Sequence, residues 1–433
     1  MTRAGLAFHR TFHALGHSRN FRLFFEGQAV SVTGTWMQMV ATAWLVLRLS
    51  GSGVALGIET ALAFGPILLL GAWGGSLADR HDKRRLLMIA QASSALLALG
   101  LFAIVATDVA RLWMVYALAS GQGIVTAIEQ PTRHSFFAEM VRPGDLMNAI
   151  SLNSAVMTGT RIVGPALAGA MIAGVGMEWC FLLNAVSFLG VIGALKAMRT
   201  EELRPQRAER EGKAIREGLR YVWRTPQLRR PLVLMAALYL FSFNYSVLMP
   251  LFAERTFAGD AGTLGTLLSV MGGGSLIGAL ALAGRGAPSE RRLALAAVAV
   301  GVVTVLVSFA PTLDTAIVAM VPLGVASIVF MTTANSTLQL SARPAMRGRV
   351  MALYGMVFLG SAPIGGPVAG WVGEHLGART GLALGGAVAL ATGIVGLWVL
   401  ARRRGAEAIE LERRRSVAGA EPVDEAVPEE LSA

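Results

Sequence analysis

The stretch LMNAISLNSAVMTGTRIVGPALAGAMIAG (146–174) is long and apolar enough to cross a bilayer, yet Arg161 lies near its middle. A membrane-spanning helix needs about 20 apolar residues. A cation at the centre of such a helix costs at least about 2.5–3.5 kcal/mol on insertion scales, so it must face a cavity or a partner. Which of the two applies depends on the rest of the chain.

The composition is typical of a membrane protein built from helices. Of 433 residues, 54% are hydrophobic and only 15% are charged, whereas a soluble domain carries about 25% charged residues. We therefore predict an all-α membrane protein with twelve transmembrane helices. The predicted spans are 23–47, 54–76, 86–106, 112–130, 147–173, 179–198, 231–253, 261–283, 293–310, 314–340, 350–373 and 380–401.

The basic residues lie almost entirely on one side of the predicted membrane. Of the 38 Lys and Arg residues, 33 lie on the side that holds both termini, 4 lie on the opposite side, and the last is Arg161. Basic loops stay in the cytoplasm, so we predict that both termini are cytoplasmic. The net charge of +11 then reflects topology and contact with the anionic lipid bilayer, and no nucleic acid is expected as a partner. The single cysteine, Cys180, rules out an internal disulfide.

The predicted spans fall into two sets of six. A cytoplasmic segment (1–22) precedes a first bundle (23–198), and a charged linker (199–230) that contains an amphipathic helix leads to a second bundle (231–401). The tail (402–433) is predicted to be cytoplasmic and disordered. The halves resemble each other at an offset of about 201 residues, as in Gly164 and Gly365. Such repeats predict two bundles with substrate held between them.

A charged loop between the second and third spans carries a family signature. GSLADRHDKRR (75–85) fits Gly-x-x-x-Asp-Arg-x-Gly-x-Arg-Arg, with Asp82 where Gly is usual. With this loop the chain resembles the major facilitator superfamily. Within it, the chain resembles the third drug:proton antiporter family, which holds the enterobactin exporter and macrolide-efflux proteins. The resemblance covers about residues 20 to 400, and its further motifs are GTWMQMVATAWLV (34–46), EQPTRHSFFAEMV (129–141), NAISLNSAV (148–156), RIVGPALAG (161–169) and WCFLLNAVSF (179–188).

The resemblance implies that this loop is a gate. Its Asp79 would latch the bundles in the outward-facing state by pairing with an Arg and with the N-terminus of the eleventh span. A carboxylate at a helix N-terminus is favourable by up to about 1 kcal/mol. Glu129 has two interpretations, a partner for the loop arginines or a proton carrier. The alternative for the arginines is that they serve only as topology signals. The predicted gating residues are Gly75, Asp79, Arg80, Arg84, Arg85 and Glu129.

Polar residues recur on one face of several predicted spans. In the first span, Gln28, Ser31, Thr35, Gln38 and Thr42 follow one another at steps of three and four residues. Such a stripe predicts an aqueous cavity, and the alternative is hydrogen bonding to the helix itself or to neighbouring helices. The other predicted cavity residues are Gln122, Thr126, Ser154, Thr158, Arg161, Asn184, Tyr239, Asn244, Thr332 and Ser336.

Arg161 itself has two interpretations. No acidic residue of the predicted spans reaches its depth, so its charge suits an anionic or acceptor-rich substrate. Alternatively, it bonds carbonyl groups exposed where Gly164 and Pro165 bend the helix, or reaches inward to Glu129. The Gly-Pro pair resembles the motif of the fifth span of antiporters, and a proline inside a helix is a usual cause of bending.

We predict a secondary transporter of the bacterial inner membrane that exports a small amphiphilic molecule such as a drug, macrolide or siderophore. The resemblance implies proton antiport, with the proton gradient as energy source and no cofactor or metal. A single chain is expected to function as a monomer. The alternatives are an importer or facilitator of a small metabolite, a lysophospholipid flippase and a non-transporting receptor. The sequence has no nucleophile constellation, metal cluster or phosphate-binding loop, so an enzyme is not expected.

Overall fold

The computed structural model describes residues 16–203, 214–282 and 288–418. In these ranges every regular element is helical. The first half consists of α3 (Arg19–Ser50), α4 (Gly53–Arg80), α5 (Lys83–Ala106), α6 (Leu112–Met140), α7 (Leu146–Gly174) and α8 (Glu178–Lys196). The linker contains α9 (Ala214–Arg224). The second half consists of α10 (Pro226–Phe241), α11 (Tyr245–Leu251), a π-helical turn (Phe252–Thr256), α12 (Ala261–Leu282), α13 (Glu290–Ser308), α14 (Leu313–Ser341), α15 (Arg347–Gly360), α16 (Ala362–His375) and α17 (Ala378–Ala418).

Local chemistry sets where several of these helices begin. The side chains of Ser18, Ser52 and Ser289 each accept a hydrogen bond from a backbone N–H in the first turn of the helix that follows. Such caps satisfy groups that lack a partner inside the helix. Asp82 does the same for α5, accepting from the Arg85 N–H at 2.9 Å. The residue that departs from the loop signature is therefore a helix cap.

Ten helical segments of the described chain are long and apolar enough to cross a membrane. They include α10 to the π-helical turn (Pro226–Thr256) and α15 to α16 (Arg347–His375), each taken as one segment. The helices α6 and α7 are each 29 residues long, but they are not among the ten. The predicted count of twelve spans therefore stays a prediction.

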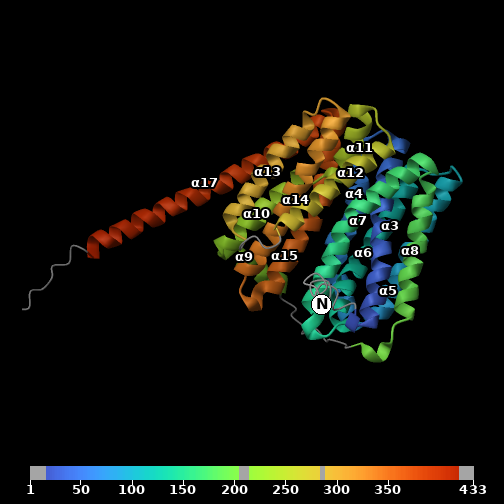
Figure 1. Ribbon diagram of the computed structural model, residues 1–433, viewed down its shortest axis with the longest axis horizontal. Coiled ribbons are helices and arrows are strands. Elements are labelled where there is room, and N and C mark those ends of the chain that lie inside the picture. Colours follow the sequence, from blue (N-terminus) through green and yellow to red (C-terminus); the bar gives the residue numbers. More distant parts are fainter. Residues whose placement is uncertain (1–15, 204–213, 283–287, 419–433) are drawn as a thin grey trace, which may run out of the picture.

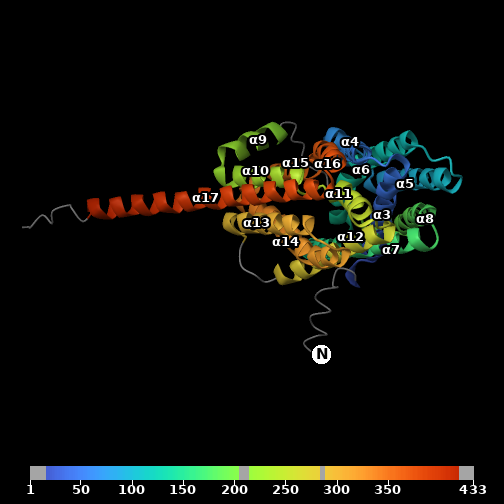
Figure 2. The same cartoon turned by 90° about the horizontal axis from the view of Figure 1, so that it is seen from above.

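The structure differs from the prediction in the seventh span, in the eleventh span and in the tail. The seventh span is broken between Phe241 and Tyr245, and the eleventh is broken at Ser361. By contrast, α7 runs without interruption through Gly164 and Pro165. The predicted disordered tail begins instead as a continuation of α17, which ends only at Ala418 and projects far from the bundle (Figures 1 and 2). Residues 419–433 lie outside the described part of the chain.

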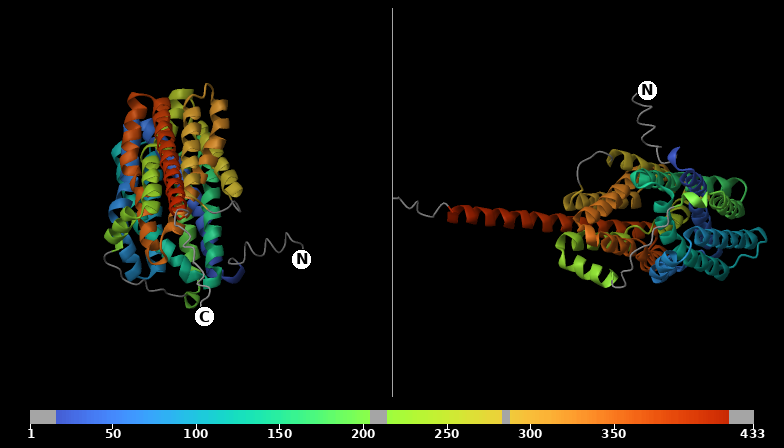
Figure 3. Two further views of the ribbon diagram at one scale, coloured as in Figure 1. Left: turned by 90° about the vertical axis from the view of Figure 1, so that its left-hand side faces the viewer. Right: turned by 90° about the horizontal axis from the view of Figure 1, so that it is seen from below.

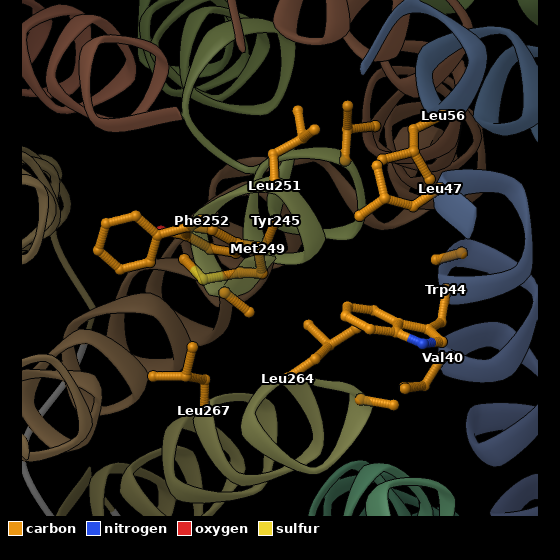
Figure 4. Close-up of a cluster of buried hydrophobic side chains, with 14 of the residues drawn as sticks. Val40, Trp44, Leu47, Leu56, Tyr245, Met249, Leu251, Phe252, Leu264 and Leu267 are labelled. Carbon is orange, nitrogen blue, oxygen red and sulfur yellow. The ribbon is translucent and has the colours of Figure 1, made fainter. Parts of the chain in front are cut away.

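The two halves meet at one end and part at the other. Figure 1 shows them converging where α4, α11 and α12 lie, and diverging toward α9 and the start of α3. At the converging end, one hydrophobic core joins both halves, as Figure 4 shows for Trp44 and Leu47 of α3 beside Met249 and Leu264. At the other end each half has its own core, one from Phe21 to Met198 and one from Val222 to Ala389. We call these the closed end and the divided end.

Helices of the two halves pack closely toward the closed end. An added Cβ at Gly57 of α4 would lie 2.6 Å from the Gly366 carbonyl oxygen of α16, and one at Gly265 of α12 would lie 2.7 Å from the Pro165 carbonyl oxygen of α7. Only residues without a side chain allow backbones this close. Seen from the side, the helices run along a common direction (Figure 3). Because α4 and α7 belong to the first half and α16 and α12 to the second, both contacts cross the interface between the halves.

Candidate functional site

Arg161 lies where α7 contacts helices of both halves. Its guanidinium carbon is 5.3 Å from the centre of the Trp36 ring of α3, a cation–π contact. One turn further, a Cβ at Gly164 would lie 2.4 Å from the Trp36 Cβ, so α7 and α3 touch there. From the other half, Gly272 of α12 approaches the Arg161 backbone carbonyl. The helix contacts therefore fix Arg161 at the interface between the halves.

Two tyrosines of the second half complete the surroundings of Arg161. The guanidinium interacts electrostatically with Tyr239 of α10 and Tyr354 of α15. The Tyr239 hydroxyl is buried and forms no hydrogen bond with any described group, although Tyr354 lies beside it. Tyr354 is also close to Asn335 of α14. We call Trp36, Arg161, Tyr239, Asn335 and Tyr354 the central cluster.

An aromatic wall surrounds the tyrosines of the central cluster. The ring of Tyr239 lies 4.9 Å from those of Phe243 and Phe358, centre to centre, and the ring of Tyr354 is stacked on Phe358 at 6.1 Å. Phe243 in turn stacks on Phe330 at 5.8 Å. These rings come from α10, α14, α15 and the break after α10, and offset rings of this kind favour planar aromatic partners.

Several predicted cavity residues hold the first half together instead of lining the interface. Asn184 of α8 is 1% exposed and donates to the Gln38 side-chain oxygen of α3 at 2.8 Å. Gln122 of α6 donates to the Ser94 hydroxyl of α5 at 3.1 Å, and Thr126 donates back to the Gln122 carbonyl. In this conformation Asn184 and Gln122 bond neighbouring helices, and the prediction that they face substrate stays a prediction.

The polar residues predicted on one face of α3 differ in solvent exposure. Gln28, Ser31 and Thr42 are buried, and the Gln28 amide nitrogen has no hydrogen-bond partner among the described groups. Thr35 is exposed, and its hydroxyl donates to the Ser31 carbonyl oxygen at 2.9 Å. Ser154 and Thr158 of α7 were predicted beside Arg161, but their side chains lie outside the described residues.

In the second half, the break of the seventh span positions Asn244. Its side chain donates to the Leu240 carbonyl oxygen at 2.8 Å and lies against Gly365 of α16, so it supports the break and helix packing. Thr332 is exposed and Ser336 is half-buried on α14. The residue of α14 that joins the central cluster is Asn335, which was not predicted although it lies one turn from Thr332 on the same side of the helix.

The loop between α4 and α5 is anchored by Arg84, which was predicted there, and by Lys83, which was not. Lys83 Nζ lies 2.5 Å from Glu139 Oε1, a nearly buried ion pair. Arg84 donates to the Leu195 carbonyl oxygen at 2.7 Å, while Arg80 and Arg85 are exposed. The close contact between α4 and α6 uses Gly74, where a Cβ would lie 2.2 Å from the Ala127 carbonyl oxygen, whereas Gly75 is more loosely packed.

The predicted latch is not closed in this conformation. Asp79 is exposed, and no hydrogen bond or ion pair joins it to another described residue. Glu129 pairs with Arg133 of its own helix at 3.5 Å, and not with Arg84 or Arg85. Arg349, at the start of α15, pairs with Glu217 of α9 at 2.8 Å. Asp79 lies at the divided end, where the halves are apart, and this separation accounts for the open latch.

A different carboxylate joins the halves at the closed end. Glu374, near the end of α16, accepts a hydrogen bond from the Ser52 hydroxyl and one from the Val54 N–H at 2.9 Å, so it caps the N-terminus of α4. Arg255 donates to the Gly51 carbonyl oxygen beside it. This contact was not predicted, because Glu374 is about 320 residues from Ser52 and nothing in the local pattern marks it.

This architecture and site agree with what the chain is similar to. Residues 11–430 match a family of major facilitator transporters described as transmembrane secretion effectors. The chain belongs to this family. It is therefore a multi-pass membrane transporter of the major facilitator type and not an enzyme.

Relatives in the family include transporters of different cargoes. The multidrug efflux pump Tap of Mycolicibacterium fortuitum is 31% identical over 79% of this chain and 87% of that protein. The staphyloferrin A transporter of Staphylococcus aureus is 26% identical, and the match covers 60% of this chain and 66% of that protein, just under two thirds of its length. Among solved structures, the peptide transporter POT superposes with a TM-score of 0.74 at 13% identity, covering 89% of this chain and 95% of that one. At that identity the likeness concerns the fold alone.

Proposed function

We propose that the chain exports a small amphiphilic molecule by alternating access, driven by proton antiport. The observation that carries this is the central cluster, in which Arg161 of one half faces Tyr239 and Tyr354 of the other. A site shared between two bundles is reached from one side or the other as the bundles rock. The multidrug efflux pump among the relatives favours export over import.

We propose twelve spans, with both termini on the cytoplasmic side of the bacterial inner membrane. The distribution of basic residues supports this orientation. The divided end, which holds the start of α3 and α9, then faces the cytoplasm, and the conformation described is inward-facing. Substrate enters between the separate cores and reaches the central cluster, while the shared core blocks exit.

Two carboxylates, Glu374 of α16 and Asp79 of α4, act as the gates of this cycle. In the inward-facing state, Glu374 of α16 caps α4 at the closed end. When the bundles rock, this contact opens and Asp79 of α4 moves toward the start of α15, where Arg349 exchanges Glu217 for Asp79. Each gate places a carboxylate at a helix N-terminus, a contact worth up to about 1 kcal/mol, so the two states stay close in free energy.

Inverted membrane vesicles test this proposal directly. Vesicles holding the chain, with an imposed inside-acid gradient, should accumulate carboxyfluorescein or radiolabelled erythromycin, and a protonophore should abolish the accumulation. Arg161→Ala should lower the initial rate at least tenfold at equal protein level, whereas Arg111→Gln in an exposed loop should not. Gradient-driven uptake only into right-side-out vesicles would contradict export, and accumulation that persists with the protonophore would contradict proton antiport.

A further inference from the structure

Arg161 carries a charge that no described acidic residue balances. It lies in the middle of α7, in contact with the Trp36 ring. Tyr239 and Tyr354 lie near enough to act on it electrostatically, and none of these three side chains is an anion at neutral pH. The ion pairs among the described residues involve other arginines, such as Arg133 and Arg349. A cation at membrane depth without a counter-ion is costly, so an anion from outside the chain fits this place.

The Tyr239 hydroxyl is a second group that lacks a well-aligned hydrogen-bond partner. It is buried in a residue only 6% exposed, and the neighbouring Tyr354 hydroxyl does not satisfy it with a well-aligned hydrogen bond. A buried polar group without a partner costs about 1–3 kcal/mol. Both Tyr239 and Arg161 can donate, and the guanidinium donates in a fork that matches a carboxylate. The missing group is therefore an acceptor with negative charge.

The aromatic wall indicates the chemistry of the rest of the ligand. Phe243 and Phe358 flank Tyr239 in the second half, and Trp36 lies on the opposite side beside Arg161. Rings of this kind contact a flat aromatic body well, through offset stacking and edge-to-face packing. A small hydrated anion such as phosphate would make no favourable contact with these rings, whereas an aromatic body can pack against them.

We propose that the central cluster binds an aromatic carboxylate. Its carboxylate lies between the Arg161 guanidinium and the Tyr239 hydroxyl, and its ring lies against the aromatic wall. The proposal rests on the proposed function, because it places the transported molecule at the interface between the halves. It narrows the substrate from an amphiphile in general to an anion with a planar aromatic part.

The test is a binding measurement that needs no gradient. Purified full-length protein in lipid nanodiscs is titrated with salicylate and with salicylamide, which has the same shape without the charge, by calorimetry. Salicylate should bind at least tenfold more tightly than salicylamide. Arg161→Gln should remove this preference, Arg161→Lys should retain part of it, and Tyr239→Phe should weaken salicylate binding several-fold. Arg161→Lys and Tyr239→Phe are close in size to the native residues, so these two variants remain informative if Arg161→Gln does not fold.

A second arginine provides a matched control. Arg379 also lies over an aromatic ring, 5.7 Å from the centre of Phe257, and donates to the Ser308 carbonyl oxygen, away from the central cluster. Arg379→Gln should leave the salicylate preference unchanged. Equal affinity for salicylate and salicylamide, no binding of either, or a preference that survives in both Arg161 variants would overturn the proposal. None of these results bears on vesicle accumulation of other compounds, so export is judged separately.

Discussion

At the scale of single residues, the ion pair between Lys83 and Glu139 is the feature with the largest expected effect on stability. The side chains are 10% and 7% exposed and join the start of α5 to the end of α6. Removing one member takes away the nearest counter-charge of the other, and breaking a buried ion pair costs up to about 3–5 kcal/mol.

We therefore expect Glu139→Gln to lower the melting temperature of the purified protein markedly. The double variant Lys83→Met with Glu139→Leu should recover much of the loss, because it leaves no charge behind. Thermal unfolding in detergent measures both. A double variant less stable than Glu139→Gln would show that packing around the pair, and not the loss of the counter-charge, dominates.

At the scale of elements, α12 and α14 pack with their backbones in near contact. A Cβ at Gly274 of α12 would lie 2.1 Å from the Val321 carbonyl oxygen of α14, whereas one at the neighbouring Gly273 would meet nothing within 4 Å. Two positions next to each other on one helix thus differ only in the face they occupy.

Gly274→Ala should force the helices apart and destabilise the protein by roughly 1–3 kcal/mol, as overpacking does. Gly273→Ala should be neutral or slightly stabilising, because Ala favours the helix over Gly. The fraction of protein that elutes as a single species after heating would compare them. Similar losses in both variants would argue against close packing of α12 on α14.

At the scale of the whole molecule, transport requires the closed end to open. Ser52 of the first half touches Glu374 of the second, and the native Cys180 is buried, so it should not react with polar thiol reagents. We expect the double variant Ser52→Cys with Glu374→Cys, bridged through two disulfide bonds by a short bis-methanethiosulfonate reagent, to stop transport in vesicles. A reductant should restore it. The single variants, treated in the same way, should remain active, and transport by the fully bridged protein would contradict alternating access at this end.

Much of the fold could be predicted from the sequence, because hydropathy and short motifs are local properties of the chain. Apolar runs predicted helices of membrane length, the loop signature predicted the transporter family, and both are confirmed. The tail from residue 402 was predicted to be disordered from its charge, and the helix instead continues to Ala418. Its many Arg, Glu, Leu and Ala residues are good helix formers, so helix propensity decided this segment.

The candidate site was only partly readable. Spacing placed Gln38 and Gln122 on polar faces, but which neighbour a polar face meets depends on how the helices pack. In the structure these two amides pair with Asn184 and Ser94 inside the first half. Arg161 was found from the sequence, since a charge inside an apolar run is conspicuous whatever its neighbours are.

The sequence by itself determined the membrane class, the family and the position of Arg161 in its helix, because hydropathy, charge and short motifs are properties of neighbouring residues. Only the tertiary structure decided which residues face Arg161, and which contacts close one end. Tyr239, Tyr354 and Glu374 come from the other half of the chain, between 78 and about 320 residues away from the groups they meet. Helix packing brings such residues together, and no local pattern encodes it.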